Sequence, residues 1–266
     1  MFKIKEVIIF ILIVIIIGGV VISIKPKKEH IIIPDNSVIV NTDSNNNIDT
    51  KTDPTAQQSI NLCYYRGDKT TSGYYDIAWL KINTHGSADN TVTGEFNNLP
   101  SEKDSKIGTF EGTVGPVDKN TMARTADVWW SSEAEGMSVK EELRVEFGDG
   151  SATAGFGEMV NRGDGVYVYK DKTNLTYIKQ MNQIDCQSLD EKLFTETYIR
   201  NNIKTIATNK PVLGGSWYVV SVVANPITHS GEVTYEDGHI QSKANFIYTY
   251  QNNPQAVTVT KFEVLK

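Results

Sequence analysis

The chain opens with a hydrophobic run that differs from everything after it. Val7–Ile24 contains 18 residues and no charged side chain. At ~1.5 Å per residue, a helix of this length covers ~27 Å, which just spans the hydrocarbon core of a bilayer. A helix that is apolar all round requires lipid or complete burial, so we expect a transmembrane anchor. The alternative is a cleaved secretory signal, with Lys3 and Lys5 before the run and a weak cleavage site at Val21–Ser23.

The chain is mostly polar between this run and about residue 60. Asn, Asp, Ser, Thr and Pro dominate this stretch. Such a composition buries too little apolar surface to offset the entropy lost on ordering. We therefore assign residues 1–28 to the anchor and residues 29–60 to a polar tether.

From Asn61 onward, apolar and polar positions alternate with a period of two between turns rich in Gly, Asn and Asp. The segments with this pattern before residue 170 are Tyr74–Asn83, Thr91–Phe96, Lys106–Val114, Ala123–Trp130, Glu141–Phe147, Ala152–Val160 and Val166–Tyr169. Short strands at roughly ten-residue spacing predict an antiparallel meander, sandwich or barrel. Residues 61–187 form this β-rich domain.

One helix is predicted within residues 188–208. Its apolar residues recur at helical spacing, and they are Leu189, Leu193, Ile199, Ile203 and Ile206. The helix is expected to run from about Asp190 to Ala207, with Ser188 as N-cap and Glu191 as its capping-box partner.

A second β segment follows in residues 209–266. Its predicted strands are Ser216–Ala224, Glu232–Tyr235, His239–Tyr250 and Ala256–Val264. A segment of ~55 residues is small for independent stability, so we expect it to pack on the first domain through the helix. The expected fold class is mainly β, with a transmembrane helix, an antiparallel sandwich or barrel-like region, one helix and a small four-stranded C-terminal segment.

Charge excludes one class of function. The formal net charge is −6, although the first 28 residues carry five lysines and one glutamate. Proteins that bind nucleic acid present basic surfaces to the phosphates. The acidic body that follows the anchor therefore argues against a nucleic-acid partner.

The two cysteines, Cys63 and Cys186, bear on location. A disulfide between them closes a loop of ~120 residues and requires an oxidising compartment. Two unrelated buried thiols are the alternative.

Lysines flank both ends of the hydrophobic run, so the charge rule alone mildly favours a cytoplasmic C-terminal side. Long domains translocate largely regardless of charge, and we expect a single-pass membrane protein whose C-terminal domain is extracytoplasmic.

No catalytic, metal or cofactor motif is complete. The sequence has no Gly-x-Ser-x-Gly, no Ser-x-x-Lys, and no pair of histidines at ligand spacing. We therefore expect no cofactor and no metal. Paired carboxylates are the remaining catalytic candidates, and those near the tryptophan pair in sequence are Glu133, Glu135, Glu141, Glu142 and Glu158. For an enzyme we favour Glu133, Glu135, Glu141 and Glu158.

Aromatic residues are the better candidates for binding. Trp129 and Trp130 are adjacent, so on a strand they point to opposite faces and only one of them joins the core. The exposed one, together with Tyr74 and Tyr75, is a candidate platform for sugar rings or a partner protein.

We expect a membrane-anchored extracytoplasmic binding or envelope-interaction module. The alternatives are a cell-envelope enzyme that acts on glycans through paired carboxylates, and a purely structural surface protein.

A family resemblance supports this location. The segments that carry it are Gly94–Pro100 (GEFNNLP), Glu102–Val114 (EKDSKIGTFEGTV), Gly155–Met159 (GFGEM) and Tyr235–Gln241 (YEDGHIQ). They resemble uncharacterised membrane-anchored proteins of candidate phyla radiation bacteria, and the likeness covers most of residues 61–266. The resemblance implies a bacterial surface location and transfers no functional residue. A looser version of the pattern resembles Bacteroidetes lipoproteins, but this chain lacks their lipobox cysteine.

The C-terminal strands carry a second, fainter resemblance. Gly215-Ser216-Trp217-Tyr218 is similar to the Gly-x-Trp opening of lipocalins, and Gly215–Tyr250 resembles META-type domains of bacterial envelope proteins. Too few strands follow for a lipocalin barrel.

Overall fold

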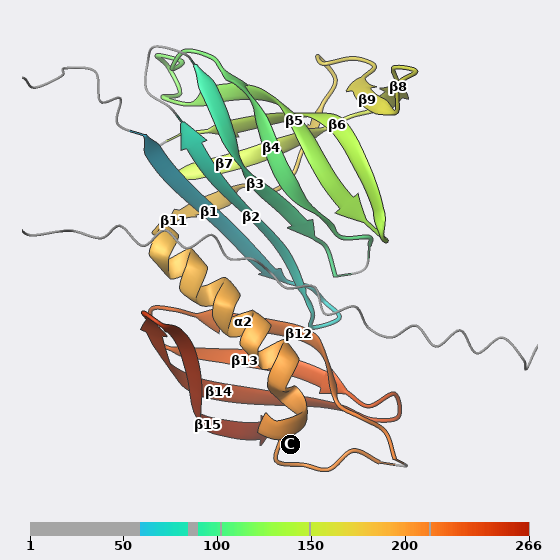
Figure 1. Cartoon of the computed structure of the whole chain (residues 1–266), viewed down its shortest axis with the longest axis vertical. Helices are drawn as coiled ribbons and strands as arrows, with labels where there is room; N and C mark the ends of the chain where they lie inside the picture. Colours follow the sequence, from blue (N-terminus) through green and yellow to red (C-terminus); the bar gives the residue numbers. More distant parts are fainter. Residues whose placement is uncertain (1–58, 85–89, 102, 149, 213, 266) are drawn as a thin grey trace, which may run out of the picture. The chain divides into compact units, whose positions relative to one another are not determined.

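The computed structural model describes residues 59–84, 90–101, 103–148, 150–212 and 214–265 (Figure 1). The predicted anchor at Val7–Ile24, and all but the last two residues of the predicted tether, lie outside these ranges. Within them, no helix has both the length and the apolar character needed to cross a bilayer.

The described part is mainly β, as predicted. The first sheet contains β1 (Ile60–Lys69), β2 (Tyr75–Thr84), β3 (Thr91–Leu99), β4 (Lys106–Val114), β5 (Arg124–Ala134), β6 (Met137–Phe147), β7 (Ser151–Phe156), β8 (Met159–Asn161), β9 (Val166–Tyr169), β10 (Thr176–Tyr177) and β11 (Met181–Ile184). The second contains β12 (Tyr218–Asn225), β13 (Ser230–Glu236), β14 (Gln241–Asn252) and β15 (Gln255–Leu265). Between the two sheets in sequence lies α2 (Cys186–Ile206).

The first sheet closes into a barrel. Strands β1 to β6 pair antiparallel in chain order, β6 pairs with β7, β7 with β11, and β11 with β1. The sequence predicted either a sandwich or a barrel. The pairing of β11 with β1 closes the sheet and shows that it is a barrel. Closure depends on β1 and β11, two strands that the alternation pattern did not predict.

The barrel interior is a packed apolar core. Its largest members with no exposed surface are Tyr64, Phe96, Leu80 and Trp130. Gly94 faces this core, and a Cβ there would collide with the ring of Phe110 on the neighbouring strand. The glycine therefore makes room for a large side chain, as Gly231 does for Phe246 in the second sheet.

Helix α2 is buried on two sides. Leu189 and Leu193 pack with Ile77 and Trp79 on the outer face of β2. Ile199 and Ile203 pack into the core of the second sheet. Helix α2 therefore packs between the barrel and the second sheet.

The helix begins earlier than predicted. Its N-cap is Asp185, whose carboxylate accepts a hydrogen bond from the backbone N–H of Ser188 at 2.9 Å. The assignment of Ser188 as N-cap was therefore wrong. Glu191 makes no capping contact among the described residues, since its carboxylate accepts from Tyr248 Oη at 3.0 Å and lies 3.4 Å from His229 Nε2.

Cys63 and Cys186 form a disulfide, which confirms the predicted pairing. Their Cα atoms lie 5.2 Å apart and they are separated by 123 positions in sequence. The bond fastens the first turn of α2 to β1, within the apolar cluster that joins helix and barrel.

A buried ion pair lies on the same helix. Lys192 Nζ is 2.8 Å from Glu196 Oε1, and the two side chains are 3% and 9% exposed. Lys192 also donates to the carbonyl of Ala224 and lies 4.4 Å from the ring centre of Tyr65. Burial raises the pKa of Glu196, and Lys192 opposes that rise. Each charge is tolerated in this position because the other is present.

Intact-mass measurement after thiol alkylation tests the disulfide. We expect no added mass when the purified, denatured protein is alkylated without reduction, and two added groups after reduction. Alkylation of both thiols without reduction would contradict the pairing.

The ion pair is tested by comparing a single and a double substitution. We expect Glu196→Gln to cost about 3 kcal/mol in the free energy of unfolding, because it leaves Lys192 buried and unbalanced. Replacing both residues with Met should cost much less or even stabilise the protein. Urea denaturation of both variants measures the difference, and equal losses would refute this account.

Candidate binding cleft

The four aromatic residues singled out from the sequence lie in three different places. Trp130 lies in the barrel core with no exposed surface, its ring centre 5.1 Å from that of Phe96. Trp129 points to the outer face of β5, half-buried, with the guanidinium carbon of Arg162 5.5 Å from its ring centre. Tyr74 and Tyr75 stand at the start of β2 and line a cleft. Trp130 is thus removed from the binding candidates, and the tyrosines become the centre of the site.

The cleft has a volume of about 590 Å³. Tyr74, Tyr75 and Ile77 form its wall on the barrel side, and Leu99 and Pro100 continue this wall at the end of β3. This volume is within the ~300 to 1,000 Å³ range of small-ligand sites.

The β3–β4 loop forms the rim of the cleft with Ser101, Lys103 and Ser105. Its position is fixed by Asp76 Oδ1, which accepts hydrogen bonds from the backbone N–H of Ser101 at 2.8 Å and from its hydroxyl at 2.9 Å. The backbone hydrogen bond from Ser101, more than any other interaction, lowers the pKa of Asp76. The ionised carboxylate therefore holds the rim.

The opposite wall comes from the C-terminal part of the chain. Arg200 projects from α2, Val220 and Ser221 from β12, and Glu236 from the end of β13. The site is therefore assembled from residues more than 100 positions apart, which the packing of α2 against barrel and sheet brings together.

Hydrogen bonds across the cleft hold Tyr74. Gln241 Nε2 donates to Tyr74 Oη at 2.9 Å and to Glu236 Oε2 at 3.2 Å. The other carboxylate oxygen of Glu236 accepts from Tyr218 Oη, which raises the pKa of that tyrosine. Both oxygens of Glu236 are thus occupied by groups of the protein.

Tyr75 is oriented by a cation. Lys69 Nζ lies 5.4 Å from the centre of the Tyr75 ring and 2.7 Å from Glu232 Oε1 on β13. The β1–β2 hairpin therefore contacts the second sheet on both sides of its turn, through Lys69 and Tyr74.

The cleft combines aromatic rings, aliphatic side chains, hydroxyl groups and two cations. Tyrosine rings offer flat surfaces for apolar faces of a ligand, and serine hydroxyls both donate and accept hydrogen bonds. This arrangement is suited to binding a polyhydroxylated ligand.

The candidate carboxylates do not converge on a common site. Glu141 points into the barrel, where its carboxylate lies 2.7 Å from Lys106 Nζ. Glu158 is exposed and paired with Lys170 at 2.8 Å, and Glu135 lies in the turn between β5 and β6. Glu133 lines a separate hollow of about 330 Å³ on the outer face of the barrel. None of the four lines the cleft at Tyr74 and Tyr75.

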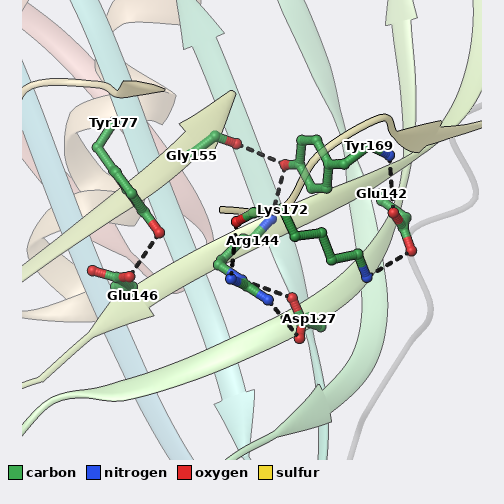
Figure 2. A network of polar contacts seen from close by, with 8 residues as sticks. All are labelled: Asp127, Glu142, Arg144, Glu146, Gly155, Tyr169, Lys172 and Tyr177. Atoms are coloured by element: carbon green, nitrogen blue, oxygen red, sulfur yellow. Dashed lines mark hydrogen bonds and ion pairs between the residues drawn. The ribbon is translucent and has the colours of Figure 1, made fainter. Parts of the chain in front are cut away.

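Other acidic residues on the barrel serve a structural role. Figure 2 shows Arg144 bound by both carboxylate oxygens of Asp127, at 2.9 and 3.2 Å. Glu142 accepts from the backbone N–H of Tyr169 at 3.0 Å and pairs with Lys172 at the same distance. Tyr169 Oη in turn donates to the carbonyl of Gly155 at 2.7 Å. This network fastens the segment between β7 and β11 to the outer face of the barrel.

No group of three or more His, Cys, Asp or Glu side chains suited to a metal ion occurs in the described ranges. His229 packs against Tyr248 with ring centres 5.6 Å apart. His239 follows Asp237, whose carboxylate accepts a hydrogen bond from the His239 backbone N–H at 2.9 Å.

Sequence reasoning missed Arg200, Lys103 and Glu236. In the sequence, Arg200 lies among polar residues of the predicted helix. Nothing there distinguishes it from an arginine on a solvent-exposed helix face. Only the packing of α2 between two sheets turns it toward the tyrosines.

Comparison with known proteins gives no relative. A scan against protein-family models found no match, and neither did searches of curated proteins and of solved structures.

The role of Asp76 predicts a pH-dependent effect on stability. Because its pKa is lower in the folded than in the unfolded protein, its contribution is present above the ordinary value of about 3.9 and is lost as pH falls through the folded pKa. We expect Asp76→Ala to cost about 1 kcal/mol at pH 7 and much less near pH 2.5. Urea denaturation at both pH values measures this, and an equal cost at both would show that the charge is irrelevant.

Proposed function

We propose that this chain is a membrane-anchored, extracytoplasmic binding module of the cell envelope, and that its site is the cleft beside Tyr74 and Tyr75. The observation that carries the proposal is the cleft itself, which has aromatic and hydroxyl walls and a volume suited to a small ligand.

An oligosaccharide is the ligand class that fits these walls. The C–H faces of sugar rings pack on tyrosine rings, and sugar hydroxyls exchange hydrogen bonds with serine side chains. Ser101 and Ser221 are placed on opposite walls, so a ligand between them meets polar groups on both sides.

The extracytoplasmic location is supported by the disulfide between Cys63 and Cys186. Disulfides of this structural kind persist in oxidising compartments and are rare in the cytosol. The hydrophobic run at Val7–Ile24 is the proposed anchor, with the polar stretch after it as the tether.

The binding role is preferred to a glycan-acting enzyme. Glycoside hydrolysis requires two carboxyl groups that flank one bond, ~5 to 9.5 Å apart. Glu133, Glu135, Glu141 and Glu158 are distributed over the interior, a turn and different outer surfaces of the barrel, and Glu236 stands in the cleft without any of them.

Titration calorimetry on the full chain in detergent micelles tests the proposal with a panel of envelope-type oligosaccharides. We expect Tyr75→Ala to weaken binding about tenfold, equivalent to ~1.4 kcal/mol, because it removes the stacking surface. Tyr177→Ala is the matched control, because Tyr177 is a partly exposed tyrosine on the barrel that hydrogen-bonds Glu146 and does not line this cleft.

The control variant should bind like the unaltered protein. Absence of binding to every oligosaccharide, or equal weakening by the two substitutions, would contradict the cleft as a glycan site.

A further inference from the structure

Two cations at the cleft have no anionic partner within the described ranges. The guanidinium of Arg200 forms no ion pair or hydrogen bond there, and neither does the ammonium group of Lys103. Most other charged side chains near the cleft are paired, including Lys69 with Glu232 at 2.7 Å. The unmatched positive charge is therefore a local property of the cleft in a chain whose net charge is −6.

The acid that lines the cleft, Glu236, forms no ion pair with either cation among the described residues. Both oxygens of Glu236 accept hydrogen bonds, one from Tyr218 and one from Gln241. These neutral donors orient the carboxylate toward Tyr218 and Gln241 and leave one negative charge in the cleft beside the two cations.

Glu196 acts on Arg200 electrostatically but is engaged elsewhere. Its Oε1 is 2.8 Å from Lys192 Nζ and accepts from the backbone N–H of Ala224 at 2.9 Å. Burial lowers the pKa of Arg200, and Glu196 only partly opposes this effect. An arginine remains protonated even so, because its ordinary pKa is above 12.

A guanidinium without an ion-pair partner gains most from an anion that brings two oxygens. Its planar donors match the two oxygens of a carboxylate or a phosphate, and such charge-assisted hydrogen bonds are roughly twice as strong as neutral ones. Lys103, on the rim loop of the same cleft, adds a second positive charge for the same anion or for a neighbouring one.

We propose that the ligand of the cleft is an acidic saccharide, and that Arg200, assisted by Lys103, receives its anionic group while Tyr74 and Tyr75 pack on its sugar rings. The inference rests on the proposed function, since it specifies the ligand of the same cleft. Carboxylate and phosphate groups both carry a negative charge and two oxygens that match the guanidinium donors.

The test compares three probes by titration calorimetry on the full chain in detergent micelles. The probes are an oligogalacturonate, its neutral methyl ester, and an oligosaccharide of similar length that carries a phosphate. We expect the oligogalacturonate or the phosphorylated probe to bind at least about tenfold more tightly than the methyl ester, and the tighter of the two identifies the anionic group. Added salt should reduce this preference.

Substitutions of Arg200 and Lys103 test whether these residues cause the preference for the acidic probe. Arg200→Gln should remove most of the preference for the acidic probe while leaving binding of the methyl ester nearly unchanged. Arg200→Lys should keep part of it, because the charge remains and the two-pronged geometry is lost. Lys103→Gln, on an exposed loop where folding is not at risk, should reduce it by a smaller factor.

Arg162→Gln is the matched control, because Arg162 is an exposed arginine that is paired with Asp164 and does not line the cleft. It should retain the full preference. Equal binding of the acidic and neutral probes would overturn the inference and leave the glycan-binding proposal standing. Failure of all three probes to bind would overturn both.

Discussion

Burial of helix α2 on two sides is the constraint on which the rest of the structure depends. Leu189 and Leu193 cover the outer face of the barrel, and Ile199 and Ile203 fill the core of the second sheet. A four-stranded sheet of this size gains much of its stability from being covered by a helix. The disulfide from Cys63 fixes the first turn of that helix, so the barrel and the helix are crosslinked covalently as well as packed together.

Two charged features of this helix bear on the proposed binding site. Its buried side carries Lys192 and Glu196 as a pair whose charges satisfy each other. One turn further along, Arg200 reaches the edge of the buried region and meets the cleft without such a partner. The same helix therefore holds the two β units together and supplies the charge that distinguishes the cleft from the rest of an acidic surface.

The sequence predicted most of the strands and helix α2, because both depend on local periodicity. The pattern failed at β1, where Tyr64 faces the core and its neighbours Cys63 and Tyr65 face the helix, so that both sides are apolar. It also failed at Ala152–Val160, which divides into β7 and β8. Closure of the barrel could not be predicted, because β11 and β1 are far apart in sequence and a local pattern carries no information on their pairing.

The site was only partly predictable for the same reason. Tyr74 and Tyr75 were identifiable as an aromatic pair next to a turn, but nothing local distinguished them from Trp130, which the strand geometry turns into the core. Arg200 and Glu236 acquire their positions only through the packing of α2 and of the second sheet. Sequence alone also placed four glutamates near one another along the chain, whereas the barrel distributes them to different surfaces.

The way in which the cleft is assembled has a consequence for biogenesis. Its barrel wall is complete when the strands up to β11 have paired, but its other wall is synthesised later, at Arg200, Val220 and Glu236. Contacts between such distant segments form slowly relative to local ones. A chain emerging N-terminus first can therefore close its barrel before the proposed binding cleft exists, and the cleft is complete only once β12 and β13 have docked.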